Sequence, residues 1–212
     1  MKLKLLALIS FSFLMSAQAL AAGEPYHEGF EYARIVPPQP TQVPVGKIEL
    51  VEVFWFGCPS CYVFEPHLEK WAKAKPANVV LIRIPAQFND SWKIHARAFY
   101  TAEVLNVGDK IQQPFFEEYH VKGNRLDSKE KLQAFFERFG VKKEQFNAAF
   151  DSPAVNKRLQ DAEILAAKYA IQAVPSLVVD GKYRAAKSQV DNSDEKLIQV
   201  LDFLIKKSEK GG

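Results

Sequence analysis

The chain has 212 residues, with 28 lysines and arginines against 25 aspartates and glutamates, so its formal net charge is +3. A balance this close to neutral gives no reason to expect nucleic acid or a lipid surface as a partner. A tetrahedral zinc site needs four ligands, and beside the two cysteines the four histidines show no paired spacing, so we expect no metal site.

Residues 1–21 have the pattern of a secretory signal peptide. Two lysines precede an apolar stretch over 5–14, and small residues offer a cleavage site between Ala19 and Ala22. A membrane anchor is the alternative, but the apolar stretch is shorter than the roughly 20 residues that span a bilayer. We therefore expect a cleaved leader and an exported protein of about 190 residues, whose net charge is +1 after loss of the two leader lysines.

The next segments indicate an α/β layer. Several prolines within 24–46 predict an irregular, extended lead-in. The almost continuously apolar run 47–56 predicts a central strand covered on both faces, and 79–84 a second buried strand. Between the two strands apolar residues recur at helical spacing, and Pro66 within that pattern predicts a kink in the helix.

From residue 88 to about 162 the pattern indicates helices only. Ser128 and Ser152 occupy positions typical of helix N-caps, and the aromatic stripes of this region are interpreted as core. Strand signals return at 176–179 and 182–184, joined by the turn dipeptide Asp180-Gly181. A last amphipathic helix follows the predicted cap at Ser193.

This order of elements predicts an α/β fold interrupted by an all-helical insertion. The α/β domain comprises residues 22–87 and 163–212, and the insertion domain comprises residues 88–162.

The two cysteines lie three apart in Cys58-Pro59-Ser60-Cys61, between a predicted strand and a predicted helix. Free N–H groups and the positive end of the helix dipole stabilise a thiolate at a helix start, so Cys58 is the expected nucleophile and Cys61 the resolving thiol. Pro59 fixes the backbone where a helix loses no hydrogen bond. A disulfide that closes so short a segment adds little stability to a fold. The pair is therefore interpreted as a redox-active disulfide and not as a structural one.

Glu52 is the second candidate, because it lies within the predicted central strand six residues before Cys58. A carboxyl buried there should have a raised pKa and exchange a proton with Cys61. The alternative is a structural ion pair with Arg83, in the middle of the second strand, with Glu49 and Glu65 in solvent.

Val174-Pro175 precedes a predicted strand that would lie beside the cysteine helix. A proline there is either a strand boundary or a cis proline that shapes a substrate groove. Phe56, Tyr62 and Val174 are expected to form an apolar surface around Cys58 that binds unfolded chains.

The cysteine motif with its flanking residues, Glu52, and Val174-Pro175 ahead of Asp180-Gly181-Lys182-Tyr183 resemble the DsbA family of bacterial periplasmic thiol oxidases, over nearly the whole mature chain. The resemblance implies a thioredoxin fold, a periplasmic location, and disulfide donation from Cys58–Cys61 to newly exported cysteine-containing proteins. It also implies reoxidation by a DsbB-type quinone-linked membrane protein, no cofactor beyond the disulfide, and a cis Val174-Pro175 bond whose valine backbone pairs with the substrate chain. We expect a monomer.

The family's usual dipeptide between the cysteines is Pro-His, and here Ser60 replaces the histidine. A histidine would stabilise the Cys58 thiolate and so make the disulfide more oxidising, whereas serine donates a hydrogen bond but adds no charge. We therefore expect a milder oxidase. The alternatives are a disulfide isomerase or reductase, and a non-catalytic chaperone or peptide-binding module.

Overall fold

The structure is a computed structural model that describes residues 23–210, so the expected leader at 1–21 lies outside the described residues. Within residues 23–210, five strands and seven α-helices follow one another, with one short 3-10 helix. In chain order they are β1 (Ala33–Arg34), β2 (Ile48–Phe54), α1 (Pro59–Ala74), β3 (Val79–Pro85), α2 (Asp90–Val104), α3 (Gly108–His120), α4 (Lys129–Glu137), α5 (Lys143–Phe150), α6 (Pro153–Lys168), β4 (Ser176–Val179), β5 (Tyr183–Ala186), η1 (Lys187–Gln189) and α7 (Asp194–Lys210).

The sheet has the strand order β1-β5-β4-β2-β3. β2 pairs in parallel with β3 and antiparallel with β4. Its seven residues are all buried, which confirms the prediction of a central strand covered on both faces. The prediction of an irregular lead-in is incomplete, because Ala33–Arg34 within it add a short edge strand to β5.

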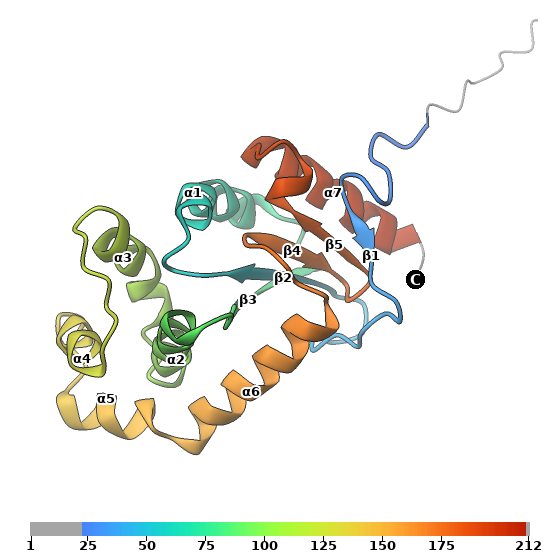
Figure 1. The fold of residues 1–212 in the computed structure, drawn as a ribbon. Coiled ribbons are helices and arrows are strands. Elements are labelled where there is room, and N and C mark those ends of the chain that lie inside the picture. Colours follow the sequence, from blue (N-terminus) through green and yellow to red (C-terminus); the bar gives the residue numbers. More distant parts are fainter. Residues whose placement is uncertain (1–22, 211–212) are drawn as a thin grey trace, which may run out of the picture.

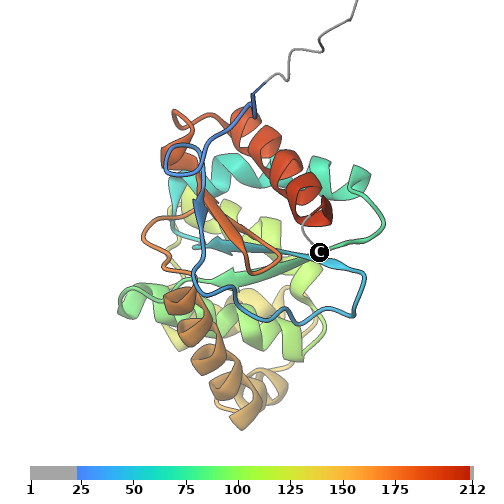
Figure 2. The ribbon, with the colours of Figure 1, turned by 90° about the vertical axis from the view of Figure 1, so that its right-hand side faces the viewer.

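Helices cover both faces of the sheet. α1 and α7 lie against each other on one face, and α2 and α6 lie on the other (Figure 1). A view turned by a quarter shows the sheet between these two layers (Figure 2). Two apolar cores result, one between the sheet and α1/α7 and a larger one that reaches into the helices α2–α6. Among the helices of residues 23–210, none is long and apolar enough to cross a membrane.

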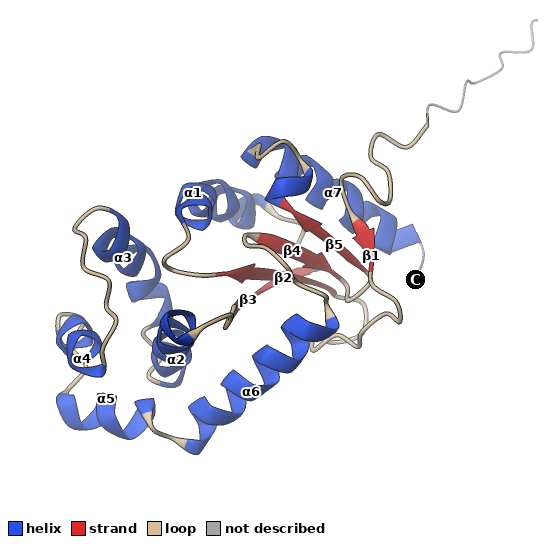
Figure 3. Ribbon diagram, in the orientation of Figure 1, coloured by secondary structure: helices blue, strands red, loops and turns tan. Residues whose placement is uncertain are grey.

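The helices α2–α6 follow one another between β3 and β4 without an intervening strand (Figure 3). The predicted caps are confirmed, because the Ser128 and Ser152 hydroxyls accept hydrogen bonds from the backbone N–H groups of Lys131 and Val155. The boundary expected at residue 162 lies inside α6, which runs without a break from the helical block back toward the sheet.

The predicted hairpin joins β4 and β5, with Asp180 at φ 55° and Gly181 at φ 62°. This left-handed backbone favours glycine at the turn. A second reason is steric: a Cβ on Gly181 would lie 2.1 Å from the carbonyl oxygen of Gln39 in the lead-in. The hairpin and the lead-in therefore pack too closely for a side chain at this position.

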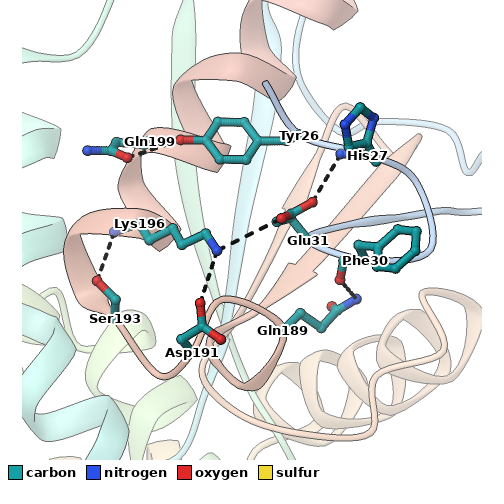
Figure 4. Close-up of polar contacts among 9 residues, drawn as sticks. All are labelled: Tyr26, His27, Phe30, Glu31, Gln189, Asp191, Ser193, Lys196 and Gln199. Atoms are coloured by element: carbon teal, nitrogen blue, oxygen red, sulfur yellow. Dashed lines mark hydrogen bonds and ion pairs between the residues drawn. The ribbon is translucent and has the colours of Figure 1, made fainter. Parts of the chain in front are cut away.

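The corner between β5 and α7 is fastened to the N-terminal segment (Figure 4). The Lys196 ammonium lies 3.0 Å from Asp191 and 3.8 Å from Glu31. The side chain of Gln189 donates to the carbonyl of Phe30. Exposed ion pairs of this kind add little stability individually, but together the contacts tie the corner to a segment more than 150 residues away in the sequence.

Candidate active site

Cys58 lies at the N-cap of α1, where the chain leaves β2 and turns into the helix. Its backbone is extended, at φ −84° and ψ 116°, and its Sγ accepts a hydrogen bond from the backbone N–H of Cys61 at 3.2 Å. Pro59 occupies the first helical position, where its missing N–H leaves no intrahelical hydrogen bond unmade. The thiol therefore takes the place that a serine or aspartate oxygen takes in an ordinary helix cap.

The two thiols differ strongly in acidity. A hydrogen bond from the Cys61 thiol, helped by the N–H groups of Cys61 and Ser60, lowers the pKa of Cys58 to about 7 against the opposing effect of burial. Burial raises the pKa of Cys61 well above its ordinary value, and the hydrogen bond and charge of Cys58 raise it further. Cys58 is 8% exposed and Cys61 is 0% exposed. One thiol is thus prepared to react as a thiolate while its partner holds a proton.

A limiting alkylating reagent is therefore expected to label Cys58 before Cys61 in the reduced protein, because only thiolates react rapidly. The rate should rise with pH around 7, following the Cys58 thiolate. Peptide mass mapping after partial labelling gives the site. The Cys58→Ser variant serves as a control and should be nearly unreactive. A label found first on Cys61 would contradict the assignment.

The loop before β4 faces Cys58. The Val174-Pro175 peptide bond is cis, in agreement with the expectation from the sequence, and the carbonyl oxygen of Val174 lies 3.6 Å from the Cys58 Sγ. The Ser176 hydroxyl donates to the carbonyl of Ala173 at 2.7 Å, a hydrogen bond that spans the Val174-Pro175 turn. A second cis bond, at Val36-Pro37, was not expected from the sequence.

Glu52 lies in β2, directly opposite Arg83 of β3, and its side chain is fully buried. One oxygen, Oε2, accepts from the Arg83 Nε at 3.0 Å, whereas Oε1 has no hydrogen-bond partner among the described residues. The same guanidinium also binds Glu65 at 3.3 Å and Glu69. The structural ion pair considered from the sequence is therefore present, but one arginine is shared among three carboxyl groups.

One guanidinium cannot neutralise that many carboxylates, so a proton is retained in the cluster. Burial, and next the charge of Glu65, raises the pKa of Glu52 to about 8 despite Arg83. Glu52 in turn contributes to the raised pKa of Cys61. The alternative that left Glu49 and Glu65 in solvent is wrong: each is 1% exposed, because Glu49 lies in the covered strand β2 and Glu65 on the buried face of α1.

The surface expected around Cys58 is corrected at Phe56. This residue is 1% exposed, because α3 of the helical block covers it and Phe115 stacks on its ring at 4.0 Å. Tyr62 is half-buried and stacks on His120 at 4.8 Å. The His120 Nε2 donates to the carbonyl of Phe56 at 2.8 Å, a contact from α3 to the cysteine loop that the sequence did not reveal.

A second contact missed from the sequence fixes Trp55, three residues before Cys58. Its indole N–H donates to the Nδ1 of His95 at 3.1 Å, and the Nε2 of His95 donates to the carbonyl of Arg125 at 2.8 Å. Burial lowers the pKa of His95 to about 4, which agrees with a neutral ring that accepts at one nitrogen and donates at the other. The Trp55 indole covers Gly57, where a Cβ would lie 2.3 Å from the indole ring.

Two thiols of unequal acidity across the first turn of a helix, with a cis proline opposite, serve reversible exchange between a dithiol and a disulfide. The fold and this pair define the class as a thioredoxin-fold thiol:disulfide oxidoreductase.

Comparison with known proteins gives the family. Residues 49–198 match the DSBA-like thioredoxin domain. The DsbA of Pseudomonas syringae pathovar tomato is 40% identical over 95% of this chain and 92% of its own length, and that of Pseudomonas aeruginosa is 37% identical over 92% and 90%. The crystal structure of Pseudomonas aeruginosa DsbA superposes with a TM-score of 0.84 at 35% identity, covering 89% of this chain and 97% of that one. The chain belongs to the DsbA family and is a thiol:disulfide oxidoreductase.

Proposed function

We propose that the protein is a periplasmic oxidase that donates its Cys58–Cys61 disulfide to exported proteins. The observation that carries the proposal is the low pKa of Cys58, about 7, beside a buried and protonated Cys61. Stabilising the thiolate stabilises the reduced form, which makes the disulfide a better oxidant. The leader over residues 1–21, cleaved between Ala19 and Ala22, would direct the chain to the periplasm.

The reaction proceeds in two exchanges. A substrate thiolate attacks the Sγ of Cys58 in the disulfide, forming a mixed disulfide and releasing the Cys61 sulfur as a thiolate. Glu52, whose pKa is about 8 and which is therefore mostly protonated at neutral pH, supplies a proton to that thiolate. A second substrate thiolate then attacks the substrate's own sulfur in the mixed disulfide. Cys58 leaves as a thiolate, so the substrate is oxidised and the protein reduced by two electrons.

The substrate chain is proposed to lie along the loop at Val174, because its carbonyl oxygen is 3.6 Å from the sulfur that forms the mixed disulfide. Tyr62 contacts the substrate chain from the first turn of α1. The helices within residues 88–162 form the insertion domain, and His120 of this domain packs against the Tyr62 ring. The disulfide is the only redox group required. A DsbB-type quinone-linked membrane protein would reoxidise Cys58 and Cys61, and the protein would act as a monomer.

The test is the transfer of disulfides to a reduced, unfolded protein with two cysteines. When the oxidised protein is mixed with an equimolar amount of this substrate, the Cys58–Cys61 disulfide should be reduced and the substrate should form its own disulfide. A Cys61→Ser variant should accumulate the mixed disulfide through Cys58. A reductase or isomerase would instead leave most of the substrate reduced, and a chaperone would retain its activity in a variant lacking both Cys58 and Cys61.

A further inference from the structure

A lysine is buried at the corner between β5 and α7. Lys187, in η1, is 7% exposed, and its ammonium lies 2.6 Å from the Oδ1 of Asp194 at the start of α7. Burying an ion pair costs desolvation free energy that the attraction between the charges does not always repay, so such a pair is weak evidence of a stabilising role. Its backbone lies against the loop that carries Val174-Pro175, and this position offers a different explanation.

Lys187 is joined to the loop that touches the reactive sulfur. Its backbone N–H donates to the carbonyl of Pro175 at 3.2 Å, and the neighbouring carbonyl of Val174 lies 3.6 Å from the Cys58 Sγ. The corner that carries Lys187 is held in place by the N-terminal segment through Gln189 (Figure 4). The backbone of Lys187 is therefore fixed beside the active-site loop, and the ion pair with Asp194 fixes its ammonium.

The residues between the cysteines supply no charge, since Pro59 and Ser60 are neutral. The titratable groups around Cys58 are Cys61 and, beyond it, Glu52 of β2. His120 is engaged with the Phe56 carbonyl, and His67 of α1 lies 4.0 Å from Asp194.

The hydrogen bond from Cys61 is the main cause of the lowered pKa of Cys58, and the positive charge of Lys187 adds a smaller contribution from outside the cysteine motif.

We propose that Lys187, held by Asp194, is a positioning residue that sets the redox equilibrium of the Cys58–Cys61 pair. A positive charge attracts the Cys58 thiolate of the reduced protein but not the neutral disulfide of the oxidised protein. Lys187 therefore favours the reduced form and makes the disulfide more oxidising, whereas Asp194 opposes this effect. The inference needs only thiol exchange at Cys58, so it stands whether the physiological direction is oxidation or reduction.

The test is the equilibrium of the purified protein with glutathione, in which the reduced protein and oxidised glutathione give the oxidised protein and two reduced glutathiones. Lys187→Met should raise the equilibrium constant about three- to tenfold, the range expected for a unit charge in partly screened protein. Asp194→Asn should change it in the opposite direction, because the ammonium then loses its counter-charge. The ultraviolet absorbance of the Cys58 thiolate, followed against pH, should shift in parallel.

Lys196→Met is the matched control. Lys196 belongs to the same corner, but its ammonium pairs with Asp191 and Glu31 instead of Asp194. Its removal should leave the glutathione equilibrium unchanged.

Lys187→Met removes the ammonium from the largely buried Asp194 carboxylate and so risks misfolding. The Lys187→Met/Asp194→Asn double variant removes both charges and provides the same test without an unpaired carboxylate. The double variant should still raise the constant, by less than Lys187→Met. The proposal would be overturned if the double variant or Asp194→Asn had the wild-type glutathione equilibrium. It would also be overturned if Lys187→Met changed this equilibrium no more than Lys196→Met does.

Discussion

Ser60→His is expected to make the Cys58–Cys61 disulfide more oxidising by about 40 mV, which corresponds to about 2 kcal/mol of added stability in the reduced form. Ser60 occupies the second position of α1, and its backbone N–H already helps to lower the pKa of Cys58. A protonated imidazole there adds a full positive charge beside the thiolate, and a charge this close typically changes a pKa by one unit or more. The pKa of Cys58 should therefore fall below 7.

The charge, rather than the size of the new side chain, should produce the change. Ser60→Asn adds a polar group of intermediate size without a charge, so it should leave the redox equilibrium close to that of the wild type. Titration against glutathione and the thiolate absorbance of Cys58 measure both variants. An equilibrium unchanged by histidine, or one moved toward a more reducing protein, would show that the residue at 60 does not control the pair.

Glu52→Gln is expected to slow formation of the mixed disulfide about tenfold or more near neutral pH, because the Cys61 sulfur then leaves without a nearby proton donor. The acid form of Glu52 is lost as the pH rises through about 8. The wild-type rate advantage over the variant should therefore be largest below pH 8 and fade above it. Stopped-flow exchange with a small thiol, measured across pH, follows this step directly.

The same substitution should also change stability, with a sign that follows from the raised pKa. The unfolded carboxyl titrates near 4.5 and the folded one near 8, so the native state binds the extra proton between these values. Wild-type stability attributable to Glu52 is present below about pH 4.5 and is lost as the pH rises toward 8. The free energy of unfolding of Glu52→Gln, relative to wild type, should increase over that interval by at most about 5 kcal/mol, since each unit of raised pKa corresponds to about 1.4 kcal/mol.

Glu69→Gln is the control for both measurements. Glu69 binds the same Arg83 guanidinium, but its side chain is 43% exposed, so it loses little hydration on folding. Because the Glu69 charge makes only a small contribution to the raised pKa of Glu52, Glu69→Gln should move the pH profile slightly toward lower pH without the tenfold loss of exchange rate. Equal exchange rates in wild type and Glu52→Gln at every pH would remove Glu52 from the mechanism and leave it a structural residue.

The parts of the site that could be predicted from the sequence are those whose neighbours lie close in the chain. Cys58, Pro59 and Cys61 share one turn at a strand–helix junction, so their spacing alone indicated the chemistry. The pairing of Glu52 with Arg83 could be anticipated because both lie in the middle of apolar strands, and the parallel register of β2 and β3 places them opposite each other.

The remaining contacts depend on how separate elements dock. Glu65 lies on α1, and sequence periodicity does not reveal that this helix turns it toward Arg83 instead of solvent. Phe56 is covered only because α3 folds back over the cysteine loop, which also brings His120 to its carbonyl. Lys187 is more than 120 residues from Cys58 in the sequence and becomes relevant only through the loop at Pro175. Sequence patterns specify local partners, whereas these neighbours are set by tertiary packing.

The reduction potential of the Cys58–Cys61 pair tests the account most directly, because an oxidase requires a reduced form that is favoured by its own structure. Equilibration of the purified protein with mixtures of reduced and oxidised glutathione, followed by trapping and separation of the two forms, gives this value. The stabilised Cys58 thiolate predicts a potential more positive than roughly −200 mV, the range of an oxidising compartment. A potential near the value of about −270 mV that is typical of thioredoxin would contradict the account and identify a reductant.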